Sequence, residues 1–204
     1  MDQYEGIIFD LGGVILNIDY DKTRLAFEEI GLTDFDGIYS QASQSGLFDE
    51  LEVGAISPQR FINEMLEHLP AGTSPNQVVS AWNAMLLDLP KENLDFLKSL
   101  HEKTRTFLLS NTNEIHLPAF HSILENSHSE SSLDPYFEKV YYSCRLRMRK
   151  PDPETFLKVC EENGLNPQKT FFVDDSIQHV EGARKAGLIA HHLRGGERIQ
   201  DLFT

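Results

Sequence analysis

Near its N-terminus this 204-residue chain reads Ile8-Phe9-Asp10-Leu11-Gly12-Gly13-Val14-Ile15-Leu16. The short apolar run that ends at Phe9 predicts a buried strand, with Asp10 at its carboxyl end. The glycines that follow turn the backbone away and leave N–H groups able to cradle an anion. A carboxylate in this setting suits a nucleophile. On this stretch alone, an aspartate that caps a turn or helix explains the pattern equally well.

Further apolar runs extend the same pattern along the chain. We expect buried strands over residues 7–10, 106–110, 140–143 and 170–174, and a more polar fifth strand over 188–193. Helical patterns separate the later runs: Pro90 starts one, Pro153 starts one that Gly164 ends, and Ile177, Val180 and Ala183 mark the inward face of another. Strands that alternate with helices predict an α/β fold, a Rossmann-like parallel sheet covered on both faces.

Residues 19–89 differ from the rest of the chain. They contain no convincing strand and several amphipathic patterns, one of which begins at Ser57-Pro58, an N-cap followed by proline. Apolar stripes such as the one around Trp82 predict the core of a small helical bundle. We therefore expect a helical cap domain over 19–89, lying above the carboxyl edge of a core domain formed by 1–18 and 90–204.

The composition of the chain excludes some classes of binding partner. The net charge of −14 argues against nucleic acid and against an anionic membrane surface. An anionic substrate would then need local positive charge in the site. No apolar run approaches the roughly 20 residues that span a bilayer, and the acidic N-terminus does not resemble a signal peptide. Two cysteines are too few for a disulfide framework, so we expect a cytoplasmic protein. These features leave the oligomeric state open.

Polar groups follow the other predicted strands where each one ends. Ser110 and Asn111 can hydrogen-bond phosphoryl oxygens, Lys150 before a proline can hold an ammonium group beside an anion, and the adjacent carboxylates Asp174 and Asp175 favour Mg²⁺ between them. Each pattern has an ordinary alternative: a polar turn, a solvated basic cluster and a helix N-cap, respectively.

Taken in order, these four elements resemble the motifs of the haloacid dehalogenase (HAD) superfamily. The motifs are Asp10 in Phe9-Asp10-Leu11, Ser110-Asn111, Lys150 in Arg149-Lys150-Pro151, and Asp174-Asp175. The helical insert is similar to the family's C1 cap, and the resemblance covers essentially the whole chain. Within the family, the sequence around Asp10 looks most like the sugar-phosphate phosphatases that include bacterial α-D-glucose-1-phosphate phosphatases.

The resemblance implies an Mg²⁺-dependent phosphatase that acts on small phosphorylated metabolites through an aspartyl-phosphate intermediate. Asp10 would attack phosphorus, Ser110 and the backbone amide after it would hold the phosphoryl group, and Lys150 would neutralise its charge. The implied Mg²⁺ ligands are Asp10, the backbone carbonyl of Gly12 and Asp175, with Asp174 as a ligand or as a support.

Gly12 departs from the family pattern, which usually has a second aspartate at this position that protonates the leaving oxygen. Loss of a general acid–base group typically costs about 10²–10⁴-fold in rate. Two alternatives therefore stay open: a phosphate- or metabolite-binding regulator with weakened catalysis, and a 2-haloacid dehalogenase, in which the acidic pair would lack a purpose.

Four other residues are assigned to the surface. His116, His121 and His128 lie in a polar stretch without metal-ligand spacing, and Arg147 is expected to be a solvated loop residue.

Overall fold

The computed structural model describes residues 4–38 and 46–203 of the chain. Its centre is a five-stranded sheet in the order β3-β2-β1-β4-β5, and all four strand pairs are parallel. The predicted α/β class with a Rossmann-like parallel sheet is confirmed. The strands are β1 (Gly6–Phe9), β2 (Thr106–Ser110), β3 (Lys139–Tyr142), β4 (Thr170–Asp174) and β5 (Ile189–His192).

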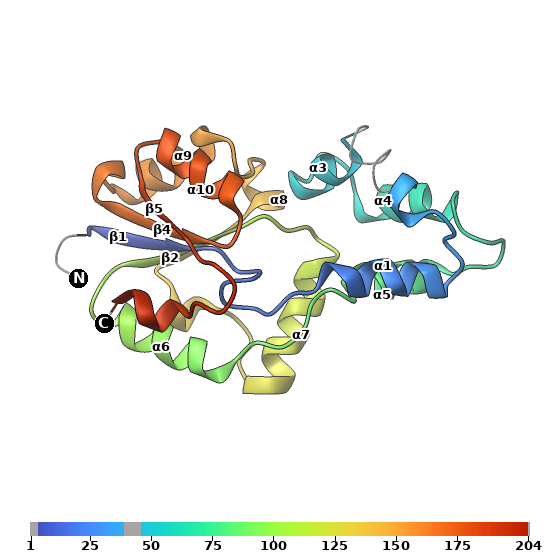
Figure 1. The fold of residues 1–204 in the computed structure, drawn as a ribbon, viewed down its shortest axis with the longest axis horizontal. Coiled ribbons are helices and arrows are strands. Elements are labelled where there is room, and N and C mark those ends of the chain that lie inside the picture. The colour runs from blue at the N-terminus through green and yellow to red at the C-terminus, as the bar shows by residue number, and fades with distance from the viewer. Residues whose placement is uncertain (1–3, 39–45, 204) are drawn as a thin grey trace.

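Helices cover both faces of the sheet (Figure 1). Alternate residues of a strand point to opposite faces, so Ile7 and Phe9 belong to one buried cluster whereas Ile8 belongs to another. The first cluster includes residues of α6 (Lys91–His101) and α7 (His116–His128), and the second includes residues of α9 (Pro153–Asn163) and α10 (Ile177–Lys185). The shorter elements are α8 (Ser143–Leu146) and the 3₁₀ turns η1 (Asp134–Tyr136), η2 (Pro167–Lys169) and η3 (Ile199–Phe203).

Most residues that were predicted to begin or end a helix lie at or next to a helix end in the structure. Gly164 ends α9 in the left-handed conformation, with φ 62°. Pro90 is the residue before α6 rather than its first residue. The inward placement of Ile177 was wrong: its side chain is 45% exposed, because the first turn of α10 lies beyond the carboxyl end of β4, whereas Val180 and Ala183 are buried.

A helical insert stands to one side of the sheet in Figure 1. It contains α1 (Tyr20–Glu29), α3 (Leu47–Glu52), α4 (Pro58–Leu66) and α5 (Pro75–Asn83), and its apolar residues, Phe61 and Trp82 among them, form a cluster of their own. Two chain segments join it to the sheet side by side: the Asn17 N–H donates to the Asp88 carbonyl, and the Asp19 N–H donates to the Met85 carbonyl, both at 2.9 Å. The proposed division after residues 18 and 89 remains a prediction.

None of the helices within residues 4–38 and 46–203 combines the length and apolar character that crossing a membrane requires.

Candidate active site

An ammonium group lies between two carboxylates at the carboxyl edge of the sheet. Asp10 follows β1 and Asp174 ends β4, and these strands are hydrogen-bonded neighbours. The Nζ atom of Lys150 is 2.7 Å from the Asp10 carboxylate and 2.6 Å from that of Asp174. Lys150 and Asp174 are fully buried. A buried ammonium is costly unless it is paired, so the two aspartates explain why Lys150 can lie there.

The charges of this cluster shift one another's protonation. Burial raises the pKa of the Asp10 carboxyl, and the Lys150 ammonium opposes that rise. Burial alone would lower the pKa of Lys150, but the charges of Asp10 and Asp174 raise it above its usual range. Burial likewise opposes ionisation of Asp174, yet Lys150 and His179 together lower the pKa of this carboxyl. Asp174 is therefore the firmly ionised partner of Lys150.

His179, which the motifs do not contain, contacts Asp174 from α10. Its Nδ1 atom lies 3.0 Å from each oxygen of the Asp174 carboxylate. The sequence offered only a histidine in the first turn of α10, with no spacing that indicates this contact. Asp174 is thus held from two sides, by Lys150 and by His179.

Ser110 ends β2 at the same edge and Asn111 follows it, but their side chains make different contacts. Ser110 lines the cavity described below. The Asn111 amide instead binds the backbone of Lys150: its Nδ2 donates to the Lys150 carbonyl at 2.9 Å, and its Oδ1 accepts from the Lys150 N–H at 3.0 Å. The side chain of Asn111 therefore orients the lysine, and the phosphate contact expected at this position would come from its backbone.

A cavity of about 450 Å³ opens above this cluster, between the sheet and the helical insert. Its lining includes polar and charged residues of the predicted site together with apolar residues of the insert and its connections. They are Asp10, Leu11, Gly12, Leu16, Ile18, Tyr20, Glu52, Met85, Leu86, Ser110, Asn111, Thr112, His116, Leu117, Phe120, Arg149, Asp175, Ser176 and His179. A larger cavity of about 560 Å³ lies along the outer side of β3 and contains none of the predicted site residues.

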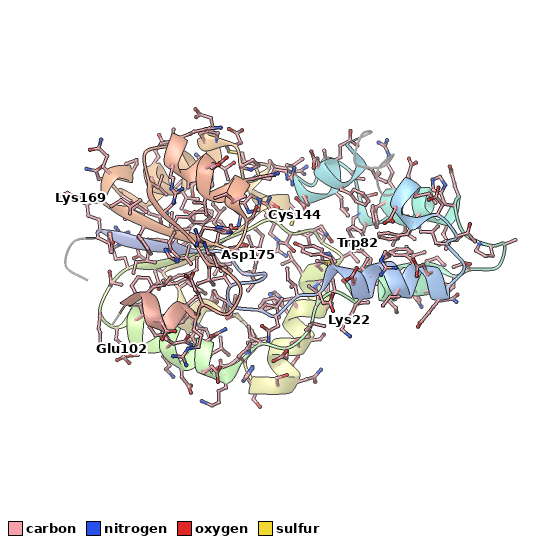
Figure 2. The ribbon with its side chains drawn as sticks, in the orientation of Figure 1. Lys22, Trp82, Glu102, Cys144, Lys169 and Asp175 are labelled. Carbon is pink, nitrogen blue, oxygen red and sulfur yellow. The ribbon has the colours of Figure 1, made fainter. Side chains whose placement is uncertain are left out.

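Three oxygen donors suited to Mg²⁺ line this cavity: the carboxylates of Asp10 and Asp175 and the backbone of Gly12. Figure 2 shows Asp175 on the sheet side of the molecule. Asp175 is open to solvent on one side, but the walls of the cavity, and after them the charge of Asp174, raise the pKa of its carboxyl. Such a carboxylate is stabilised by a cation, so the donor set fits the ion.

Asp174 is less suited than Asp175 to bind Mg²⁺. Ligand atoms of Asp10, Asp174 and His179 lie within 4.8 Å of one another. However, the Lys150 ammonium already lies between the two carboxylates, and Asp174 does not line the cavity. Both oxygens of the Asp174 carboxylate also lie 3.0 Å from His179, so they already have partners, which favours Asp174 as the support of Lys150.

The two glycines after Asp10 have different surroundings. Gly13 has φ +74°, and a Cβ atom there would lie 2.1 Å from a carboxylate oxygen of Asp175, so the chain requires glycine at this point. At Gly12 a Cβ would lie 3.2 Å from the Cδ1 atom of Ile18. A side chain at residue 12 therefore requires Ile18 to shift by a few tenths of an ångström.

Two arginines that precede Lys150 hold the insert against the sheet. Arg149 contacts Glu52 at 2.8 Å and Asp49 at 2.6 Å, and Arg147 donates to the carbonyl of Gly54. Burial raises the pKa of Glu52, with Arg149 opposing the rise. The expectation that Arg147 is an exposed loop residue is confirmed, but its contact with Gly54 was not expected, because the sequence does not indicate that the insert packs against this loop.

His116 is buried, contrary to its expected surface position. Its ring stacks on Trp82 of α5, with centroids 5.4 Å apart and planes 5° apart, and its Nδ1 atom lies 2.7 Å from the Asn83 side-chain oxygen. Sequence reasoning missed this residue because both partners belong to the insert, 33 or more positions away. Burial lowers the pKa of His116 to about 4.

A parallel sheet with a carboxylate, a hydroxyl, a lysine and an acidic pair at one edge defines a hydrolase of the haloacid dehalogenase type. The chain belongs to this family: the haloacid dehalogenase-like hydrolase model matches residues 4–187. The recognition and the enzyme class are thereby confirmed.

Characterised relatives resemble the chain over nearly its full length. D-ribitol-5-phosphate phosphatase of Bacteroides thetaiotaomicron is 31% identical over 90% of this chain and 88% of its own. A HAD family enzyme of the same organism, solved in complex with magnesium and inorganic phosphate, has a TM-score of 0.87 and 34% identity, covering 98% of this chain and 100% of its own. A predicted HAD-like hydrolase of Porphyromonas gingivalis has a TM-score of 0.86 and 32% identity, covering 98% and 96%.

Proposed function

We propose that this chain is an Mg²⁺-dependent phosphatase that hydrolyses small phosphorylated metabolites, sugar or polyol phosphates in particular. The observation that carries the proposal is the buried Lys150 ammonium, which contacts Asp10 and Asp174 beneath a cavity that Asp10, Ser110 and Asp175 line. In this reading residues 19–89 act as a cap domain over a core formed by 1–18 and 90–204.

In the proposed reaction, a carboxylate oxygen of Asp10 attacks phosphorus while the bond to the ester oxygen breaks. The alkoxide that leaves takes a proton from water, since Gly12 offers no acid. Water then attacks the aspartyl phosphate, which releases inorganic phosphate and restores Asp10. Ser110 and the backbone after it would hold the phosphoryl oxygens, and Lys150 would offset their charge.

Mg²⁺ would be held by Asp10, the Gly12 carbonyl and Asp175, and it would supply charge neutralisation for the phosphoryl group. The complex of the Bacteroides thetaiotaomicron enzyme with magnesium and phosphate supports this choice of ion. The name of the D-ribitol-5-phosphate phosphatase supports the choice of a hydroxylated phosphate ester as substrate.

The test is hydrolysis of p-nitrophenyl phosphate by the purified protein with Mg²⁺, with EDTA, and by Asp10→Asn with Mg²⁺. We expect turnover only in the first sample. Equal rates in all three would refute both the nucleophile and the metal assignment. Halide release from 2-chloropropionate without metal would favour a dehalogenase, and phosphate binding without turnover would favour a regulator.

A further inference from the structure

His116 has an accessible nitrogen with no partner inside the cavity. It is 8% exposed and lies at the start of α7, where the cavity separates the sheet from the insert. Its Nδ1 atom lies within hydrogen-bond distance of the Asn83 side-chain oxygen. Its Nε2 atom has no hydrogen-bond partner among the described residues, and it is accessible to solvent. The Nε2 atom is therefore reached from the cavity.

The ring that carries this nitrogen is held in place from several directions. The Asn113 side chain accepts from the His116 N–H at 3.0 Å, which anchors the backbone. Trp82 covers one face of the ring, and Phe48 stacks on the far side of Trp82, with centroids 5.3 Å and planes 6° apart. Figure 2 shows Trp82 on the side of the insert. A ring fixed in this way loses little freedom when it binds a ligand.

The contact with Asn83 also determines which ring nitrogen of His116 donates a hydrogen bond and which accepts one. An Nδ1–H that donates to the Asn83 side-chain oxygen leaves Nε2 as an acceptor. Apolar residues that line the same cavity, such as Leu117 and Phe120, offer no hydrogen bond through their side chains. An acceptor that a bound ligand shields from water costs free energy unless the ligand donates to it.

We propose that His116 is a specificity-determining residue whose Nε2 atom accepts a hydrogen bond from a hydroxyl group of the substrate's organic part. The inference rests on the proposed phosphatase function and adds the substrate class to it. A hydroxylated phosphate ester satisfies the nitrogen, whereas an alkyl phosphate leaves it unpaired. The site then selects polyol or sugar phosphates over esters of the same length that lack hydroxyls.

The test compares two esters with matched chains, D-ribitol 5-phosphate and n-pentyl phosphate. We expect the wild-type protein to have a kcat/KM about 10-fold or more higher for the ribitol ester, as one hydrogen bond to an otherwise unpaired group predicts. His116→Phe keeps an aromatic ring against Trp82 but removes the nitrogen, and it should lower this ratio by about 10-fold, mainly through KM. The difference between the two leaving groups is the same for both proteins and cancels in this comparison. His121→Phe, on the same helix but outside this cavity, should leave the ratio unchanged.

Two further measurements distinguish a failure of the role proposed for His116 from a failure of the proposed phosphatase function. Asn83→Leu frees Nδ1 without touching the ring and should lower the ratio as well, so the proposal can be tested even if His116→Phe fails to fold. p-Nitrophenyl phosphate, which has no hydroxyl, should be hydrolysed by all variants within about 3-fold of wild type. A wild-type ratio near one, or variants that slow all three esters equally, would overturn the role of His116. Failure of the wild type on every ester would instead refute the phosphatase function.

Discussion

The side-chain amide of Asn111 and the backbone of Lys150 form a closed pair of hydrogen bonds, one at 2.9 Å and one at 3.0 Å. The pair ties the residue after β2 to the loop that presents the lysine, although 39 positions separate them. Bonds to both the N–H and the carbonyl of one residue fix the orientation of its backbone as well as its position. The placement of the Lys150 ammonium between Asp10 and Asp174 thus depends on a residue that does not touch that ammonium.

Asn111→Ala should lower kcat by about 10–100-fold and change KM for p-nitrophenyl phosphate little, because a misplaced lysine weakens charge neutralisation in the transition state. Asn111→Asp keeps the acceptor for the Lys150 N–H but loses the donor, and it should be less damaging. Steady-state kinetics with saturating Mg²⁺ measure both effects. An Asn111→Ala protein with unchanged kcat would show that the lysine does not need this support.

The two adjacent aspartates should respond differently to substitution. Asp175→Ala should abolish the Mg²⁺ dependence and nearly all activity while leaving the metal-free melting temperature equal or higher, because one of the neighbouring negative charges is gone. Asp174→Ala leaves the buried Lys150 with Asp10 alone, which costs about 3–5 kcal/mol. That cost should lower the melting temperature by about 10 °C.

Thermal unfolding without metal and isothermal titration with Mg²⁺ distinguish these outcomes. Asp174→Asn provides the matched control, because it removes the charge but keeps the volume. If Asp174→Ala loses Mg²⁺ binding without loss of stability, the roles proposed for the two carboxylates are reversed.

Acid should destabilise the protein through His116. Its pKa is about 4 in the folded chain and 6.5 for an ordinary histidine, so the unfolded chain binds the proton first as pH falls. The stabilisation is complete above pH 6.5 and is lost as pH falls toward 4, by about 3 kcal/mol in all. Urea unfolding of wild type and His116→Phe at pH 7.5, 6, 5 and 4.5 tests this. The two free energies of unfolding should converge as pH falls, and a constant difference would contradict the prediction.

The absence of a side chain at Gly12 should make the rate depend steeply on the leaving group. Without an acid at this position, esters of acidic alcohols and anomeric sugar phosphates should react much faster than primary alkyl phosphates. Gly12→Asp should flatten a plot of log kcat/KM against leaving-group pKa. Because Ile18 lies 3.2 Å from the position of the new Cβ, Gly12→Asp with Ile18→Val is the better-fitting variant, and Ile18→Val alone is its control. A shallow slope in the unaltered protein would mean that another group supplies the proton.

The sheet and the polar residues at its carboxyl edge could be predicted because each is marked by a local sequence pattern. Asp10, Ser110 and Asp174 each stand at the end of an apolar run, and parallel strands bring their carboxyl ends to one edge. Two strands have the predicted bounds, and each of the other three differs by one residue at both ends, a difference within the fraying of strand termini.

The roles of individual side chains were harder to predict because they depend on distant partners. The motif that contains Asn111 does not reveal that its amide faces the backbone of Lys150. His179 lacks a spacing that points to Asp174, and the buried position of His116 arises only when Trp82 and Asn83 of the insert pack on α7. Such contacts follow from how the insert lies against the sheet, which no local pattern encodes.

The packing of Ile18 against Gly12 affects which substitutions this chain could accept in evolution. A mutation that places an aspartate at residue 12 requires the Ile18 side chain to move by a few tenths of an ångström, so its effect depends on which residue occupies position 18. We therefore expect the two positions to be epistatic. A built-in acid would enter this site most readily after a smaller residue has replaced Ile18.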